Sequence, residues 1–285
     1  MLDALFWVGV YFLLGNKKLQ TEKGETQSEE MKRIGLIGLS DPVDKSKVNE
    51  IITRLEKSGY QIIVADSLFK SASAKEKADD FNMFCKLDLE GIFDLSGGDL
   101  ANTCIPFIDF KAYQNCSACF YGYSDLSVVL NALYSKTKKK TCLFQLRNNL
   151  NIEDTQNAFK FTWLKKKNMK GIVIGGNIRC FLKLAGTSYF PETEDKILFL
   201  ESHSGNINKI ITYLTQLEMM GVFNKINGLI LGQFTELDKT STDHLLESYV
   251  SKYPIGIIRT HEVGHSLNSK AVWIGKEYCF KSKGA

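Results

Sequence analysis

Three residues whose side chains suit acyl transfer each follow an apolar segment of the sequence. Ser124 comes directly after residues 120–123, and Glu201 comes directly after residues 196–200. His265 lies in a loop that follows a third apolar segment. A serine nucleophile needs a base that takes its proton and an acid that fixes the tautomer of that base. These residue types predict a serine hydrolase, provided that the fold brings the three side chains together.

The segment Gly122-Tyr123-Ser124-Asp125 has the form of a sharp turn between a strand and a helix. At such a turn the serine is exposed at the carboxyl edge of a sheet, and the N–H of Asp125 points towards an oxyanion. Serine is also a favoured residue at helix N-caps, which is the structural alternative. The G-x-S-x-G elbow is not met, because Leu126 occupies the position of the second glycine.

A second turn, Ser96-Gly97-Gly98-Asp99, follows another apolar segment. Two adjacent glycines let the backbone approach a substrate closely and leave N–H groups free to donate hydrogen bonds. The alternative is an ordinary turn between a strand and a helix.

Two other histidines compete for roles in this chemistry. His203 lies two residues after Glu201 and is a rival partner for its carboxylate. His261 and His265 have the H-x-x-x-H spacing of a metal site on a helix, but Gly264 and the position after a strand argue against a helix there. We therefore expect neither a metal ion nor another cofactor.

From residue 33 onwards, short apolar strands alternate with amphipathic helices, which is typical of a parallel sheet covered by helices on both faces. The strands are predicted at 34–39, 61–65, 91–95, 120–123, 172–174, 196–200, 228–231 and 256–258. The helices are predicted at about 48–55, 72–84, 125–135, 207–217 and 240–250, from apolar positions that recur with helical spacing. Because parallel strands end at one edge, Ser124, Glu201 and His265 are able to meet there.

The predicted elements fall into two α/β parts. Residues 31–140 are predicted to form an N-terminal nucleophile domain with a parallel sheet, and residues 171–285 a C-terminal domain that carries Glu201 and His265. The Lys- and Asn-rich residues 141–170 are predicted as an interdomain connection. Segments 271–274 and 277–280 flank Gly275-Lys276 and predict a closing hairpin.

Composition narrows the classes of function. The chain has 285 residues and a net charge of +4, and its two short lysine runs, 138–140 and 165–167, have no aromatic residues between them. This pattern argues against a nucleic-acid partner. The seven cysteines form an odd number, and only Cys116 and Cys119 have the C-x-x-C spacing. Reduced thiols in a cytoplasmic protein are the simplest interpretation.

Residues 1–30 are predicted to be an extension outside both domains. Residues 4–14 are an unbroken apolar run, too short for a membrane span, and residues 16–30 have the composition of a linker. Three interpretations compete for these residues: a weak membrane tether by residues 4–14, a misassigned start upstream of Met31, and a non-domain extension. The last two together are favoured.

Eight segments together resemble the LD-carboxypeptidases, a family of serine peptidases that includes the microcin C self-immunity peptidases. The matching segments are GGDLAN (97–102), IPFIDF (105–110), GYSDL (122–126), GGN (175–177), LAGT (184–187), ILFLE (197–201), GLILGQF (228–234) and GH (264–265). They occur in the order and with the approximate spacing of the family, between about residues 32 and 280.

The resemblance implies a two-domain α/β fold with the active site between the domains. Ser124 would be the nucleophile, His265 the general base and Glu201 the acid that orients it. The backbone N–H groups of Gly98 and Asp125 would form the oxyanion hole.

The resemblance also implies a substrate, a murein tetrapeptide in the cytoplasm. The enzyme would release its terminal D-alanine during cell-wall recycling, and homodimers are common in the family. Gly97, Asn102 and Asn177 are the further positions that we expect to contact substrate. Arg147 and Arg179 are both candidates to bind the substrate carboxylate, and the sequence does not choose between them.

Some positions depart from the family pattern and leave the substrate open. Ser96 replaces an arginine that many members have, Ser202 replaces a second acid, and residues 143–146 replace a His-Gly-Pro segment. The first alternative is a self-immunity peptidase that cleaves a peptidyl- or aminoacyl-nucleotide toxin. The second is a non-catalytic ligand-binding homologue.

Overall fold

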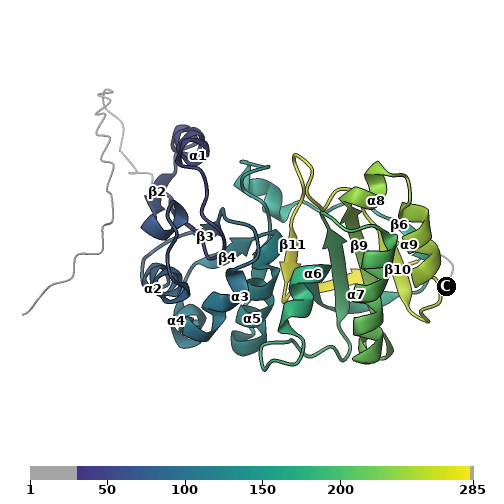
Figure 1. Ribbon diagram of the computed structural model, residues 1–285. Coiled ribbons are helices and arrows are strands. Elements are labelled where there is room, and N and C mark those ends of the chain that lie inside the picture. The colour runs from purple at the N-terminus through teal and green to yellow at the C-terminus, as the bar shows by residue number, and fades with distance from the viewer. Residues whose placement is uncertain (1–30, 283–285) are drawn as a thin grey trace, which may run out of the picture.

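The computed structural model describes residues 31–282, which form two six-stranded sheets with helices packed against them. Figure 1 shows the two sheets and their helices as neighbouring lobes. The strands of the first sheet are β1 (Arg33–Ile37), β2 (Gln61–Val64), β3 (Gly91–Asp94), β4 (Cys119–Gly122), β5 (Thr141–Leu143) and β11 (Val272–Ile274).

The first sheet has the order β11-β5-β4-β3-β1-β2. Its five N-terminal strands are parallel, whereas β11 pairs with β5 in the antiparallel direction. The predicted parallel arrangement is therefore confirmed for the four strands that were predicted, β1 to β4, while β5 and β11 are additions to this sheet that were not predicted. The order β2-β1-β3-β4-β5 is that of a doubly wound fold, in which ligands bind beyond the carboxyl ends of the strands.

Helices cover both faces of this sheet because its buried side chains alternate between the faces. On β3, Ile92 belongs to the large core shared with α2 and α5, and the next residue, Phe93, belongs to the smaller core under α1.

The helices of both lobes are α1 (Lys45–Lys57), α2 (Ala74–Phe84), α3 (Ala101–Cys104), α4 (Phe110–Asn115), α5 (Ser127–Thr137), α6 (Ile178–Phe181), α7 (Ile207–Met219), α8 (Thr235–Lys239) and α9 (Asp243–Val250).

Helix α1 illustrates how local sequence determines these elements. Asp44 caps its N-terminus by accepting hydrogen bonds from the backbone N–H groups of Ser46 (2.8 Å) and Lys47 (3.3 Å). Val48, Ile51 and Leu55 are buried on one face, and each such side chain stabilises the fold by about 1.5–3 kcal/mol.

The second sheet has the order β12-β7-β8-β9-β10-β6. Its four central strands are parallel, and β12 and β6 are antiparallel at the two edges. The strands are β6 (Thr162–Lys165), β7 (Met169–Asn177), β8 (Ile197–Ser202), β9 (Gly228–Phe234), β10 (Gly256–Arg259) and β12 (Glu277–Phe280).

The predicted closing hairpin is wrong. β11 and β12 pair with different sheets, β11 with β5 and β12 with β7, so the chain crosses from one lobe to the other at Gly275. Residues 141–170, predicted as a connection, contribute β5 to the first sheet and β6 to the second. The domain boundaries at 140 and 170 stay a prediction.

The helix that follows Ser124 is fixed directly to the second sheet. The side chain of Asn131 donates to Gly175 O at 2.7 Å and accepts from Gly175 N at 2.9 Å. Ser127 Oγ accepts a hydrogen bond from Asn177 N at 2.9 Å. α5 therefore links the two sheets through buried polar contacts, and this sets where β4 ends relative to β7 and β8.

We expect replacement of Gly175 by alanine to lower the free energy of unfolding by about 3 kcal/mol or more, because backbone strain and a steric clash add up. Gly175 has φ +108°, and a Cβ there would lie 2.1 Å from Phe199 O. Urea unfolding of Gly175→Ala measures the loss. The control is Gly186→Ala, where φ is +79° but nothing lies within 4 Å, so only about 1 kcal/mol of strain is expected. Equal losses in the two variants would contradict the steric argument.

Between residues 31 and 282, no helix is both long and apolar enough to cross a membrane. The interpretations of residues 1–30, including a membrane contact by residues 4–14, fall outside the described residues.

Candidate active site

Ser124 is held in a strained turn at the carboxyl end of β4. Its φ is +55°, a value that costs a non-glycine residue about 1–3 kcal/mol and that clusters at functional sites. A Cβ on Gly122 would lie 2.7 Å from Leu126 Cβ, so glycine is needed for the chain to turn this tightly. Tyr123, and not Ser124, occupies the cap position of the 3-10 turn that follows. The N-cap alternative for Ser124 is therefore wrong.

Glu201 and His265 approach each other at the edge of the second sheet. Glu201 belongs to the end of β8 and is fully buried. Its Oε2 lies 3.0 Å from His265 Nδ1, although the geometry falls short of a hydrogen bond. The His265 ring also packs edge-to-face on Tyr123, with 4.8 Å between ring centroids. This arrangement leaves the other ring nitrogen, Nε2, available to a second partner.

The loop that carries His265 is held by Gln233, which lies at an irregularity in the pairing of β9 with β8. Gln233 Nε2 donates to His261 O (2.5 Å) and to Ser266 Oγ (2.8 Å), and its Oε1 accepts from Ser266 N (3.2 Å). A Cβ on Gly264 would lie 2.1 Å from the same Oε1. Gln233 thus forms hydrogen bonds at both ends of the 261–266 loop. Gly264 lets the backbone of this loop approach the Gln233 side chain closely.

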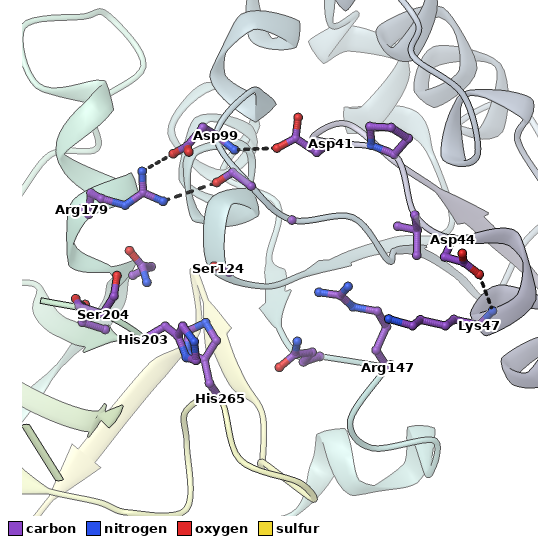
Figure 2. A pocket seen from close by; sticks show the side chains of 17 residues that line it. Asp41, Asp44, Lys47, Asp99, Ser124, Arg147, Arg179, His203, Ser204 and His265 are labelled. Atoms are coloured by element: carbon purple, nitrogen blue, oxygen red, sulfur yellow. Dashed lines mark hydrogen bonds and ion pairs between the residues drawn. The ribbon is translucent and has the colours of Figure 1, made fainter. Parts of the chain in front are cut away.

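Ser124 and His265 line one cavity of about 460 Å³ between the lobes. Figure 2 shows both residues in this cavity, together with His203. Other residues that line it are Gly97, Gly98, Asn177, Arg147 and Arg179. Asn102 does not line it, and Glu201 lies behind His265.

Within residues 31–282, Ser124 Oγ makes no hydrogen bond with His265. Catalytic hydrogen bonds are often long without substrate and tighten only in the complex. The arrangement therefore brings a candidate nucleophile and base into one cavity, with the acid already beside the base.

The turn Gly97-Gly98 faces the same cavity with a free donor. Gly98 has φ +125°, and a Cβ on it would lie 1.7 Å from Asp41 Oδ2. Its carbonyl accepts from Arg179 at 3.4 Å, while its N–H donates no hydrogen bond to any residue in the described part of the chain. Such an N–H is suited to stabilise an oxyanion.

Asp125 is a buried anchor that sequence reasoning assigned only for its backbone N–H. Its side chain is fully buried and accepts from Ser40 Oγ (2.7 Å), Ala101 N (2.8 Å) and Lys183 Nζ (2.7 Å). Lys183 lies after α6, so this ion pair ties the Ser124 turn to the segment that follows β7. No spacing or periodicity signals such a long-range partner.

Tyr123 is the second residue that sequence reasoning missed. Its hydroxyl is buried, and burial, followed by the charge of Glu201, raises its pKa well above the usual value. Tyr123 Oη, both carboxylate oxygens of Glu201 and His265 Nδ1 all lack a satisfactory hydrogen bond. Unsatisfied buried polar groups cost stability, so a cluster of them indicates a role other than stabilising the fold.

The rival histidines take other positions. His203 is exposed and its ring centroid lies 4.5 Å from that of His265. Desolvation, followed by repulsion from His265 and Lys239, lowers its pKa. His261 is exposed and does not line the cavity. The ion pair of Glu201 is with His265.

Asp94 supports the glycine turn from below. It ends β3 and accepts from Leu39 N (2.8 Å), Ser96 N (2.8 Å) and Ser96 Oγ (2.5 Å). Burial raises the pKa of Asp94 to about 6, against the hydrogen bonds that lower it.

Because the folded-state pKa of Asp94 lies above the unfolded value, the folded state holds this proton more tightly. The stabilisation is full below about pH 4 and is lost as the pH rises to about 6. We expect the free energy of unfolding of the wild type to fall by up to about 3 kcal/mol over this range relative to Asp94→Asn. Urea unfolding at several pH values measures the difference. Parallel pH profiles of the two proteins would show that Asp94 titrates normally.

Among residues 31–282, no three His, Cys, Asp or Glu side chains gather as a candidate metal site. The turn, the His–Glu pair and the free backbone donor together have the composition of a site for acyl transfer through a serine.

Two family models match most of the chain. Residues 34–143 match the LD-carboxypeptidase N-terminal domain, and residues 170–280 match the LD-carboxypeptidase C-terminal domain. Both β4 with its following turn and β8 with Glu201 fall inside these matches.

Similar proteins come from several bacteria. The chain is 24% identical to the "Probable murein peptide carboxypeptidase" of Bacillus subtilis, over 93% of this chain and 91% of that protein. It is also 24% identical to the microcin self-immunity protein MccF of Escherichia coli, over 72% of this chain and 76% of that protein. A muramoyltetrapeptide carboxypeptidase from Oxalobacter formigenes has the same fold, with a TM-score of 0.76, 21% identity and coverage of 88% and 96%. An MccF-like protein from Bacillus anthracis gives a TM-score of 0.78 at 21% identity, with coverage of 91% and 96%.

Proposed function

The chain belongs to the LD-carboxypeptidase family, and on this basis we propose that it is a serine carboxypeptidase that hydrolyses an L,D-peptide bond. Its substrate would be a murein tetrapeptide, from which it releases the terminal D-alanine in cell-wall recycling. The name of the similar Bacillus subtilis protein supports this substrate class.

One observation carries the proposal. A serine with φ +55° and a histidine 3.0 Å from a buried carboxylate open into the same cavity, beside a glycine turn with a free N–H. Strain at Ser124 and unsatisfied atoms around Glu201 both cost stability. Folds retain such costs at sites that serve a function.

In the proposed mechanism, Ser124 Oγ attacks the carbonyl carbon of the scissile bond while His265 Nε2 takes the hydroxyl proton. Glu201 holds the Nδ1–H tautomer of His265 and stabilises the imidazolium that forms. The N–H groups of Gly98 and Asp125 donate to the oxyanion. The C–N bond then breaks, His265 protonates the leaving amine, and a water molecule hydrolyses the acyl-serine with His265 again as base.

Incubation with defined peptides tests the substrate. The wild type is expected to release D-alanine from an L,D-linked tetrapeptide and not from its D,D-linked isomer, as measured by chromatography of the products. A third arm uses an aminoacyl sulfamoyl nucleoside, the type of compound bound in a solved MccF complex of similar fold. Cleavage of this compound, with no cleavage of either peptide, would favour the self-immunity alternative over the murein peptidase.

The non-catalytic alternative is tested independently of substrate. A fluorophosphonate probe is expected to label the wild type at Ser124, as measured by mass spectrometry of the labelled peptide. An unlabelled protein that binds the tetrapeptide without hydrolysing it would favour the ligand-binding homologue.

We place the reaction in the cytoplasm. All seven cysteines are free thiols, as expected in a reducing compartment. We also propose a homodimer, which light scattering of the purified protein tests.

A further inference from the structure

Two cations project into the cavity without a partner. Lys47 from α1 and Arg147 from the loop after β5 both line it, and neither forms an ion pair with any residue between 31 and 282. Figure 2 shows both side chains among those that line the cavity. Unpaired cations that converge on a cleft raise the local concentration of anionic ligands.

The carboxylates that line the cavity form no close ion pair with Lys47 or Arg147 in the described part of the chain, although the Asp44 carboxylate, which accepts hydrogen bonds from Ser46 and Lys47, also feels the Lys47 charge. Asp44 is occupied as the N-cap of α1, and Asp41 Oδ2 lies near Asp99 N at 3.3 Å. Asp99 pairs with Arg179 and Lys183. The buried Asp94 acts on Arg147 only at a distance, since its oxygens accept from Leu39 and Ser96.

Arg179, the other candidate for the substrate carboxylate, is already engaged. Its guanidinium forms an ion pair with Asp99 and donates to Gly98 O at 3.4 Å. It would have to break both contacts to bind a substrate anion. Arg147 has no such contacts to lose.

Arg147 is also placed beside the reacting groups. A Cβ built on Gly97 would lie 3.4 Å from its Nη2, and Gly98, whose N–H is the proposed oxyanion donor, is the next residue. The following residue, Asn148, donates from its side chain to His265 O at 3.2 Å. The guanidinium therefore lies next to the glycine turn, and Asn148 ties the adjoining backbone to the loop of the proposed general base.

We propose that Arg147 binds the free α-carboxylate of the residue that the enzyme releases, with Lys47 as a second, supporting cation. This inference rests on the proposed function and deepens it by assigning the recognition of the chain end. The carboxylate of a terminal residue lies one residue, or about 3.8 Å between Cα atoms, beyond the scissile bond. A guanidinium next to the oxyanion turn is at the right range to form two parallel hydrogen bonds with it. The site would accordingly select an exopeptidase substrate and reject an internal peptide bond.

The test compares two substrates and three enzymes, the wild type, Arg147→Gln and Arg147→Lys. The substrates are an L,D-tetrapeptide with a free C-terminal carboxylate and the same peptide as its C-terminal amide. We expect the wild type to prefer the acid by about 100-fold in kcat/KM, because a charge-assisted pair is lost with the amide. In Arg147→Gln the preference should fall to about threefold or less, mainly through a rise in KM for the acid. Arg147→Lys should restore part of the preference, since it restores the charge without the bidentate geometry.

Matched measurements separate recognition from chemistry. Arg54→Gln is the control. Arg54 lines a second pocket, next to Glu50 and Leu150, but does not line the cavity of Ser124, so this variant should leave the acid preference unchanged. Fluorophosphonate labelling of Ser124 should proceed at the wild-type rate in Arg147→Gln, which shows an intact nucleophile. A wild-type acid preference that persists in Arg147→Gln would overturn this inference and leave the proposed function standing. Labelling of Ser124 without hydrolysis or binding of either peptide would overturn the proposed function and the inference with it.

Discussion

Replacement of Ser124 by alanine is expected to reduce the hydrolysis of an L,D-tetrapeptide by about 10⁴–10⁶-fold, the range seen when a serine nucleophile is removed. Ser124 Oγ is the atom that would form the acyl bond. A water molecule in the variant would be neither held in the same position nor activated as a nucleophile in the same way. D-alanine release by equal amounts of the two proteins measures the effect. Circular dichroism and urea unfolding should show the wild-type fold, because alanine fits the same turn.

The strain at Ser124 adds a second, independent readout. Its φ of +55° is accessible to glycine without cost. Ser124→Gly is therefore expected to raise the free energy of unfolding by about 1 kcal/mol while it abolishes hydrolysis. The matched control is Ser251→Ala at the end of α9, which should change neither property. Activity of Ser124→Ala close to that of the wild type would remove Ser124 from the mechanism.

Replacement of Glu201 by glutamine is expected to lower kcat by about 10³–10⁴-fold, because a neutral amide no longer holds the required tautomer of His265. The carboxylate is fully buried, lies 3.0 Å from His265 Nδ1 and lacks a complete set of hydrogen bonds. The free energy of unfolding should stay equal or rise, since glutamine removes an incompletely compensated buried charge. Loss of activity without loss of stability is the signature that separates a functional acid from a structural one.

The control for Glu201 is another glutamate close to the same loop. Glu262 pairs with Lys270 at 2.8 Å and is partly exposed, so Glu262→Gln should keep kcat within about twofold. His203→Ala addresses the rival base. If His203→Ala abolished hydrolysis while Glu201→Gln left it intact, His203 would replace His265 as the base.

The strand ends that carry the site were predictable from local pattern. The run of apolar residues before Ser124 and before Glu201 is a property of neighbouring residues, and both runs form strands, β4 and β8. β5 was missed because it has only three residues, Thr141–Leu143, directly after a lysine run. So short a segment has no periodicity of its own, and its sheet neighbours determine its conformation.

What local pattern could not predict is contact between distant residues. Lys183, from the segment after β7, forms an ion pair with Asp125, from the segment after β4. Tyr123 lies close to Glu201 because α5 packs on β7. The closing hairpin was wrong for the same reason. Gly275 turns the chain as predicted, with φ +85°, but the two flanking segments find better partners in separate sheets. Asn102 belongs to the short helix α3 that follows the glycine turn, and it does not line the cavity.

The position of β11 has a consequence for the order in which the protein becomes functional during synthesis. The first lobe receives its outer strand from Val272–Ile274, so β5 presents an unpaired edge until the ribosome has made these residues. A nascent chain that stops short of residue 272 therefore carries Ser124 in an incomplete sheet and, if it stops before residue 265, has no His265 at all. Because Val272–Ile274 follows His265 in the chain, we expect a chain terminated before residue 265 to lack both the proposed general base and the outer strand, and to expose an open strand edge that quality-control factors can recognise.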